Sequence, residues 1–171
     1  MNILSIGSAL AVATLAFAAA PAFADECSAV TAAMMMAAKT PYSLTVNRTD
    51  KSGKTASAHM VQTATTKYIE TNGVWTSIPM SSEEMIEALN EKLKTGKMTC
   101  TRDGAEAVNG KPATIYAVHM ENNGTASDGR LWVSSDRMIK SELRLNGSIT
   151  TTMFDYENVK PPSDAKPLGT K

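Results

Sequence analysis

Three of the four Asn-Gly dipeptides constrain the fold of this chain more than any other feature of its sequence. They are Asn72-Gly73, Asn109-Gly110 and Asn146-Gly147, and short runs rich in β-branched or alternating apolar residues flank them. Asn-Gly supplies the two positive φ angles of a type I′ turn, which joins antiparallel strands through a loop of two residues. The chain is therefore predicted to fold largely as consecutive β-hairpins.

The short turns also predict which residues face each other. The strands expected to flank the first and third turns directly are residues 67–71, 74–78, 139–145 and 148–156. A two-residue loop places Thr71 opposite Val74 in the first hairpin. In the other hairpin it places Leu143 opposite Thr150, with one face apolar and the other charged. This division is typical of a sheet with one side in water.

Two segments break the strand pattern and are predicted as helices. Residues 26–39 carry apolar side chains at helical spacing, and a proline ends the segment. Residues 81–94 begin with Ser81 and Glu84 at the spacing of a capping box, and Gly96 is expected to end the helix. The fold class expected is mainly β with two helices (α+β), a curled antiparallel sheet or unclosed β-barrel with the helices against its concave face.

The first 24 residues have the composition of a secretory signal peptide. They carry no charged side chain, and Pro21 precedes the small-residue pattern Ala22-Phe23-Ala24. Cleavage is predicted after Ala24, which would export the chain to the periplasm. The domain organisation expected is a signal peptide over 1–24, one β-rich domain over 25–159 and a flexible tail over 160–171. No integral membrane segment is expected after cleavage.

The only two cysteines are Cys27 and Cys100. Disulfides persist in oxidising compartments, and an even cysteine count in an exported domain favours a bridge. A disulfide between these two residues is therefore predicted. It would join the first helix to the middle of the chain.

The charge balance and the missing motifs argue against several function classes. The chain has 17 basic and 17 acidic residues, which argues against nucleic acid or an anionic membrane as the main partner. It contains no phosphate-binding loop, dinucleotide-binding glycine pattern or zinc-protease motif. His59 and His119 each lie within a strand pattern, and neither has a catalytic partner on its own strand. We expect neither catalysis nor a cofactor.

Several short motifs resemble the periplasmic lipoprotein-carrier (LolA-like) superfamily. They are Asp128-Gly129-Arg130-Leu131-Trp132-Val133, Ile139-Lys140-Ser141-Glu142, the closing strand from Phe154 to Pro162, and Tyr68 followed by Gly73-Val74-Trp75. The resemblance implies an unclosed β-barrel whose concave side holds acyl chains beneath helices. It also implies an outer-membrane lipoprotein-sorting type of role. The same architecture serves mycobacterial lipid-binding lipoproteins and a periplasmic regulator of envelope-stress signalling.

The function expected is non-enzymatic binding of an acyl chain, another hydrophobic ligand or a lipidated protein. The candidate ligand-binding residues are apolar positions of the strands and of the second helix: Trp75, Met85, Leu89, Val118, Leu131, Ile139, Leu143 and Phe154. The alternative is a module with a filled core that docks an envelope protein. A weaker alternative is copper handling, because methionine thioethers bind Cu(I) and Met34-Met35-Met36 stand together. No metal site is otherwise expected.

Overall fold

Ten strands form a single sheet in the computed structural model, which describes residues 23–168. The helices are α1 (Phe23–Lys39) and α2 (Ser82–Thr95). The strands are β1 (Tyr42–Thr49), β2 (Thr55–Gln62), β3 (Thr66–Thr71), β4 (Val74–Pro79), β5 (Lys97–Val108), β6 (Lys111–Asn122), β7 (Thr125–Ser134), β8 (Arg137–Leu145), β9 (Ser148–Asp155) and β10 (Lys166–Pro167). Of the predicted signal peptide, residues 1–22 lie outside the described part of the chain.

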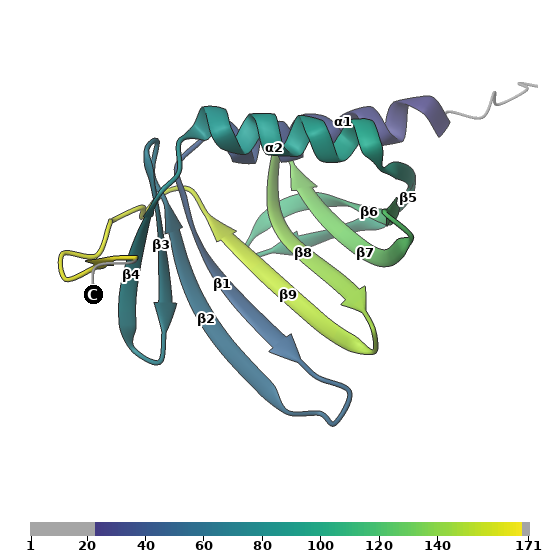
Figure 1. Cartoon of the computed structure of the whole chain (residues 1–171). Coiled ribbons are helices and arrows are strands. Elements are labelled where there is room, and N and C mark those ends of the chain that lie inside the picture. The colour runs from purple at the N-terminus through teal and green to yellow at the C-terminus, as the bar shows by residue number, and fades with distance from the viewer. Residues whose placement is uncertain (1–22, 169–171) are drawn as a thin grey trace, which may run out of the picture.

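The strand order explains why the sheet curls without closing. The order is β10-β4-β3-β2-β1-β9-β8-β7-β6-β5, so two meanders meet where β1 pairs with β9. Every neighbouring pair is antiparallel except β10 with β4. Figure 1 shows the sheet bending beneath the helices, with α2 as the connection from β4 to β5. The predicted fold class, a curled and unclosed sheet with helices on its concave side, is confirmed.

The Asn-Gly turns have the backbone conformation that the sequence predicts. Asn72, Asn109 and Asn146 have φ angles of 52°, 51° and 50°, and each following glycine is also at positive φ. Thr71 lies opposite Val74, and Leu143 lies opposite Thr150. The register predicted for these two hairpins is confirmed.

Helix α2 has the ends predicted from sequence but buries none of its side chains. The Ser81 hydroxyl accepts a hydrogen bond from the Glu84 N–H at 3.1 Å, and the Glu84 carboxylate accepts one from the Ser81 N–H at 2.7 Å. At the other end, the Gly96 N–H donates to the Lys92 carbonyl. The apolar stripe of this helix is nevertheless only half-buried. Part of this apolar stripe therefore faces solvent and not the protein core.

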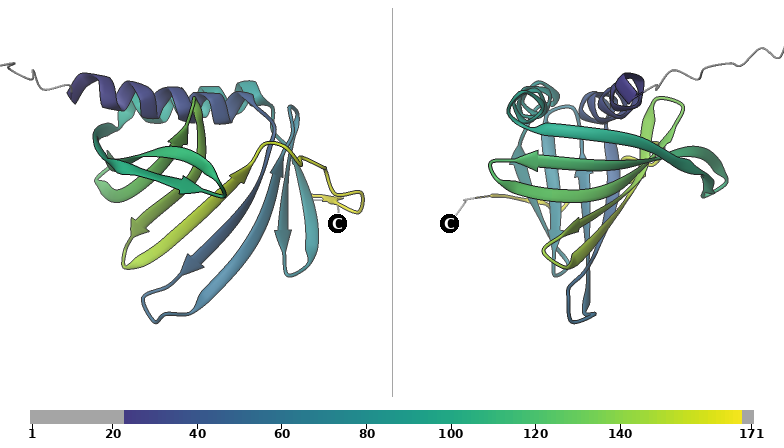
Figure 2. Two further views of the ribbon diagram at one scale, coloured as in Figure 1. Left: turned by 180° about the vertical axis from the view of Figure 1, so that it is seen from behind. Right: turned by 90° about the vertical axis from the view of Figure 1, so that its right-hand side faces the viewer.

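Helix α1 is the better-packed of the two. It lies beside α2 across the top of the sheet, as the end-on view in Figure 2 shows, and it contacts β5, β7 and β8. Val30 is fully buried and packs with Cys100 and Val118. Along β6, side chains alternate between the two faces. Val118, together with Tyr116 and Met120, therefore defines the helix-facing side of the sheet.

The segment after β9 contains a pairing that the sequence did not predict. Residues 160–168 belong to the expected flexible tail, yet Lys166–Pro167 pairs in parallel with β4. The Leu168 N–H donates to the Ser77 carbonyl at 2.9 Å. A pairing of two residues leaves no periodic pattern to detect. Its effect is to cover the outer edge of β4.

Candidate functional site

An open-sided cavity of about 1000 Å³ lies between α2 and the helix-facing side of the sheet. Its apolar lining residues come from both helices, β5, β6 and β8, and they are Met34, Ala88, Leu89, Leu93, Met98, Met120, Leu143 and Leu145. Pockets that bind small molecules commonly measure about 300–1,000 Å³ and are mainly apolar. The cavity has the size and the surface of a site for an apolar ligand.

Strand register brings these side chains together. Met98 of β5 lies directly opposite Met120 of β6, and the alternation that places Val118 under α1 places both methionines on the same face. Met34 of α1 packs against the same cluster from above. Methionine is unbranched and flexible, so it adapts to partners of variable shape. This wall of the cavity is therefore apolar and deformable.

The polar residues of the cavity gather where α2 ends and β6 turns into β7. They are Glu91, Lys92, Thr95, Lys97, Glu121, Asn122, Asn123, Thr125 and Ser127. Lys92 lies one turn beyond Leu89, on the cavity side of α2. The Asn122 Oδ1 atom is buried and has no hydrogen-bond partner among the described residues. The cavity thus combines an apolar interior with a polar end.

Two of the eight predicted ligand-binding residues line this cavity. They are Leu89 and Leu143. Val118 lies instead in the buried cluster beneath α1, and Leu131 packs against that cluster. Met85 is half-buried on α2, outside the cavity lining.

The other three lie apart from the cavity. Ile139 is at an irregularity in the pairing of β7 with β8 and packs with Trp132 in a second core cluster. Phe154 stacks with Tyr156, with 6.3 Å between ring centroids. Trp75 lies opposite Glu70, and Ile69 belongs to the neighbouring cross-strand pair on the helix-facing side. Because successive pairs lie on opposite faces of a sheet, Trp75 is on the face turned away from the helices.

Five apolar lining residues with large side chains were missed by the sequence-based selection. They are Met34, Leu93, Met98, Met120 and Leu145. Met98 comes just after the expected end of the second helix at Gly96, where no strand was assigned, so its pairing with Met120 was not apparent. Leu93 lies one turn of the second helix from Leu89, on the same side of that helix. Its spacing from Leu89, which was itself a predicted ligand-binding residue, could have identified Leu93 as a lining residue.

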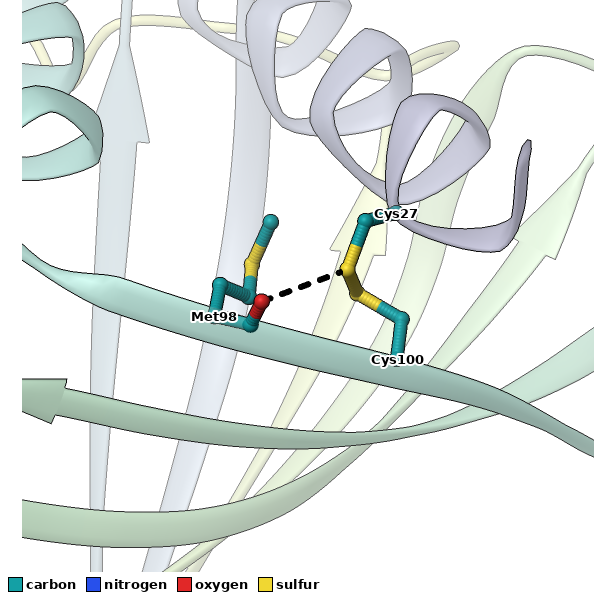
Figure 3. The surroundings of a disulfide bond; sticks show 3 residues. All are labelled: Cys27, Met98 and Cys100. Carbon is teal, nitrogen blue, oxygen red and sulfur yellow. Dashed lines mark hydrogen bonds between the residues drawn. A yellow bond between two sulfur atoms is a disulfide. The ribbon is translucent and has the colours of Figure 1, made fainter. Parts of the chain in front are cut away.

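The predicted disulfide between Cys27 and Cys100 is present. Figure 3 shows it joining α1 to β5, next to Met98. The Cys27 Sγ atom lies 3.7 Å from the Met98 carbonyl oxygen. A disulfide sulfur carries no hydrogen, so this is a packing contact. The bridge fixes α1 over the sheet beside the methionine wall of the cavity.

The two histidines lie on the sheet away from this cavity. His119 Nδ1 is 2.7 Å from Asp128 Oδ1, a contact between neighbouring strands that sequence analysis did not identify. Among residues 23–168, no hydroxyl or thiol is hydrogen-bonded to His119. His59 Nδ1 is 3.2 Å from Thr45 Oγ1. Both histidine side chains are exposed, so neither site has the enclosure of an active centre.

Within residues 23–168, no group of three His, Cys, Asp or Glu side chains is placed to hold a metal ion. No helix in this range is long and apolar enough to span a bilayer.

Comparison with known proteins gives structural similarity but no sequence match. No family model matches the chain, and no curated protein matches it in sequence. LprF from Mycobacterium bovis is 10% identical, with a TM-score of 0.49 over 84% of this chain and 99% of that one. Lipoprotein LppX from Mycobacterium tuberculosis is also 10% identical, with a TM-score of 0.49 over 82% and 98%. MucB is 11% identical, with a TM-score of 0.47 over 86% and 66%. Similarity at this level leaves the function of the chain to be argued from its own residues.

Proposed function

We propose that this chain is an exported, non-enzymatic binding protein that holds an acyl chain or a similar apolar group between α2 and the curled sheet. The observation that carries the proposal is the cavity of about 1000 Å³ with its mainly apolar lining. Apolar side chains that line an open-sided cavity are in contact with water, which is unfavourable. A ligand that covers them removes this apolar surface from water.

The incomplete burial of α2 supports the same function. Leu89 and Leu93 are only half-buried although they belong to the apolar stripe of the helix. Both line the cavity. A hydrocarbon ligand would cover these side chains without any polar partner. Burial of apolar surface would then drive binding, with a contribution of about 0.8 kcal/mol for each buried methylene group.

The filled-core alternative, a module that only docks an envelope protein, fits the cavity less well. Such a module needs no internal space, and its helices would pack fully onto the sheet. Here α1 does contact the sheet, with Val30 buried against Val118. Helix α2 contributes no buried residue. The ligand-binding function therefore accounts for a feature that the alternative leaves unexplained.

A series of saturated fatty acids tests the proposal. Displacement of a fluorescent fatty acid should strengthen about fourfold for each added methylene, as about 0.8 kcal/mol per group requires, until the chain outgrows the cavity. Native mass spectrometry of the exported protein should detect co-purified lipid. No displacement at any chain length, together with no bound lipid, would reject the proposal.

A matched pair of substitutions on α2 locates the site. Leu89→Trp adds a bulky side chain to the cavity lining and should abolish displacement of the probe. Ile86→Trp changes the same helix outside the lining and should leave binding within about twofold of wild type. No loss in either variant would mean that the ligand binds elsewhere. Equal losses would mean that the helix itself is disrupted, which circular dichroism of both variants measures.

One observation also favours the copper alternative and makes it testable. Met34, Met98 and Met120 line one cavity from three different elements, whereas neighbouring methionines on a helix point in different directions. Thioethers are soft ligands that select Cu(I). Titration with Cu(I) against a competing chelator should show a single site lost in a variant with all three changed to Leu. Equal Cu(I) uptake by wild type and this variant would reject the copper alternative.

Export to the periplasm is part of the proposal. Expression with the complete leader in a bacterium should yield a periplasmic protein whose first residue is Asp25. N-terminal sequencing measures this directly. Retention of Met1 in the mature protein would contradict cleavage.

A further inference from the structure

Apolar surface continues from the cavity to the tip of the β8–β9 hairpin. Leu145 lines the cavity and is 36% exposed. Ile149 is 38% exposed, and it lies opposite Arg144, whereas Leu145 lies opposite Ser148. Successive cross-strand pairs lie on opposite faces. The turn therefore presents one apolar side chain on each face of the sheet, and one of them belongs to the cavity.

The β1–β2 turn lies beside this tip. Thr49 pairs directly with Ile149, and a Cβ atom added to Gly147 would lie 3.6 Å from the Lys51 Cβ. Both views of the molecule show these turns together at one end of the sheet, away from the helices (Figures 1 and 2). The two turns form one surface, which we call the hairpin tip surface. It comprises residues 48–54 and 144–149.

The hairpin tip surface is basic although the chain is neutral. It carries Arg48, Lys51 and Lys54 against a single acid, Asp50. Arg144 also belongs to this surface, but its guanidinium is ion-paired with Glu142 at 3.0 Å, so the excess of positive charge comes from the β1–β2 turn. The Asp50 carboxylate faces its own turn, where it accepts hydrogen bonds from the N–H groups of Ser52 and Lys54 at 2.8 and 3.0 Å. These bonds hold the turn that presents the lysines. The overall balance of 17 basic and 17 acidic residues therefore hides a local excess of positive charge.

We propose that the hairpin tip surface docks the protein on anionic lipid bilayers. Exposed Leu and Ile side chains surrounded by basic residues match the interface of such a bilayer, where apolar groups enter the acyl boundary and Lys or Arg contact anionic headgroups. Two apolar side chains on narrow turns offer too little area for a stable protein interface, which needs about 800 Å² per partner. Insertion into a lipid interface needs only a few such side chains.

Docking in this orientation brings the apolar lining at Leu145 to the bilayer. An acyl chain would then pass between membrane and cavity along continuous apolar surface. This passage rests on the proposed function, but the docking does not. Vesicle binding and fatty-acid binding in solution are therefore separate measurements.

Flotation of the exported protein with vesicles tests the docking. Vesicles of phosphatidylcholine with one third phosphatidylglycerol should bind the protein, and pure phosphatidylcholine vesicles should bind it much more weakly. Binding should fall as salt is raised, because exposed charges are screened. Lys51→Gln with Lys54→Gln should lower the partition coefficient about thirtyfold, as about 1 kcal/mol for each lysine requires.

Ile149→Ser tests the apolar part of the surface. It should reduce binding to anionic vesicles at least severalfold, whereas Val74→Ser should leave it unchanged. Val74 is the matched control because it is 52% exposed at the β3–β4 turn, outside the hairpin tip surface. Thermal melting checks that each variant folds.

Three results overturn the docking: equal binding to the two vesicle types, no loss with the lysine variants, or equal losses for Ile149→Ser and Val74→Ser. If fatty-acid displacement persists in any of these cases, the proposed function stands and the docking alone fails. If the wild-type protein shows no displacement of the fluorescent fatty acid, the proposed function is rejected instead.

Discussion

Removal of the disulfide should cost this fold a large share of its stability. Cys27 and Cys100 are separated by 73 residues along the chain. A cross-link closing a loop of this length lowers the entropy of the unfolded chain by an amount equivalent to about 4 kcal/mol at 25 °C. Domains are typically stable by only about 5–15 kcal/mol. The disulfide is therefore expected to supply a substantial part of the free energy of unfolding.

The packing of α1 makes this dependence stronger. Among residues 26–39 of this helix, those buried besides Val30 are alanines: Ala33, Ala37 and Ala38. Alanine buries little apolar surface, so the helix gains less from packing than one with leucines at these positions would gain. The covalent link to β5 compensates for a weak apolar contact.

Thermal and urea denaturation of the Cys27→Ala, Cys100→Ala double variant measure the effect. For a domain of this size, each 1 kcal/mol shifts Tm by about 3–4 °C, so Tm should fall by about 12–16 °C. Wild-type protein unfolded and refolded with a thiol reductant should show a similar loss, which controls for the alanine side chains. A loss below about 1 kcal/mol in both samples would refute the reasoning. It would mean that packing alone holds α1.

Three further predictions concern single contacts. Ser81→Ala removes the capping hydrogen bond to Glu84 and should lower the free energy of unfolding in urea by about 1 kcal/mol. Gly147→Val places a β-branched residue at a φ of 74° and should lower Tm by several degrees, whereas Ile149→Val at a nearby strand position should have little effect. Hydrogen bonds from the backbone N–H groups after Asp155 hold the pKa of its carboxyl below the ordinary value. Because this folded-state pKa is lowered, its stabilising contribution is present at neutral pH and is lost as the pH falls below about 4, so Asp155→Asn should reduce the loss of stability in acid.

The parts of the fold that were predicted from sequence depend on local chemistry. Asn72-Gly73 and Asn146-Gly147 determine both a turn and the register of its strands, and Ser81 with Glu84 marks the start of α2. Each of these signals acts within a few residues. The disulfide was predicted from the expected export of the chain and from the cysteine count. No information about distant packing was needed for any of them.

The parts that were missed depend on how distant elements meet. Ile139 has the spacing of a residue facing the helices, but the irregular pairing beside it places it with Trp132. Met98 and Met120 become a cavity wall only when β5 pairs with β6 beneath α1. Alternation identifies an apolar face but does not show which part of that face a helix leaves uncovered. The sequence therefore predicted that the candidate site would be an apolar surface. Of its individual lining residues, it predicted only Leu89 and Leu143.

The sheet ends at β5 on one side and at β10 on the other, and these two edges do not pair. In a closed barrel, widening the interior means breaking a ladder of backbone hydrogen bonds. Here α2 connects β4 to β5, so movement of this helix would separate side chains without breaking any strand pairing. Such a movement would change the volume of the cavity and leave the sheet intact. One fold could in this way bind ligands of different width.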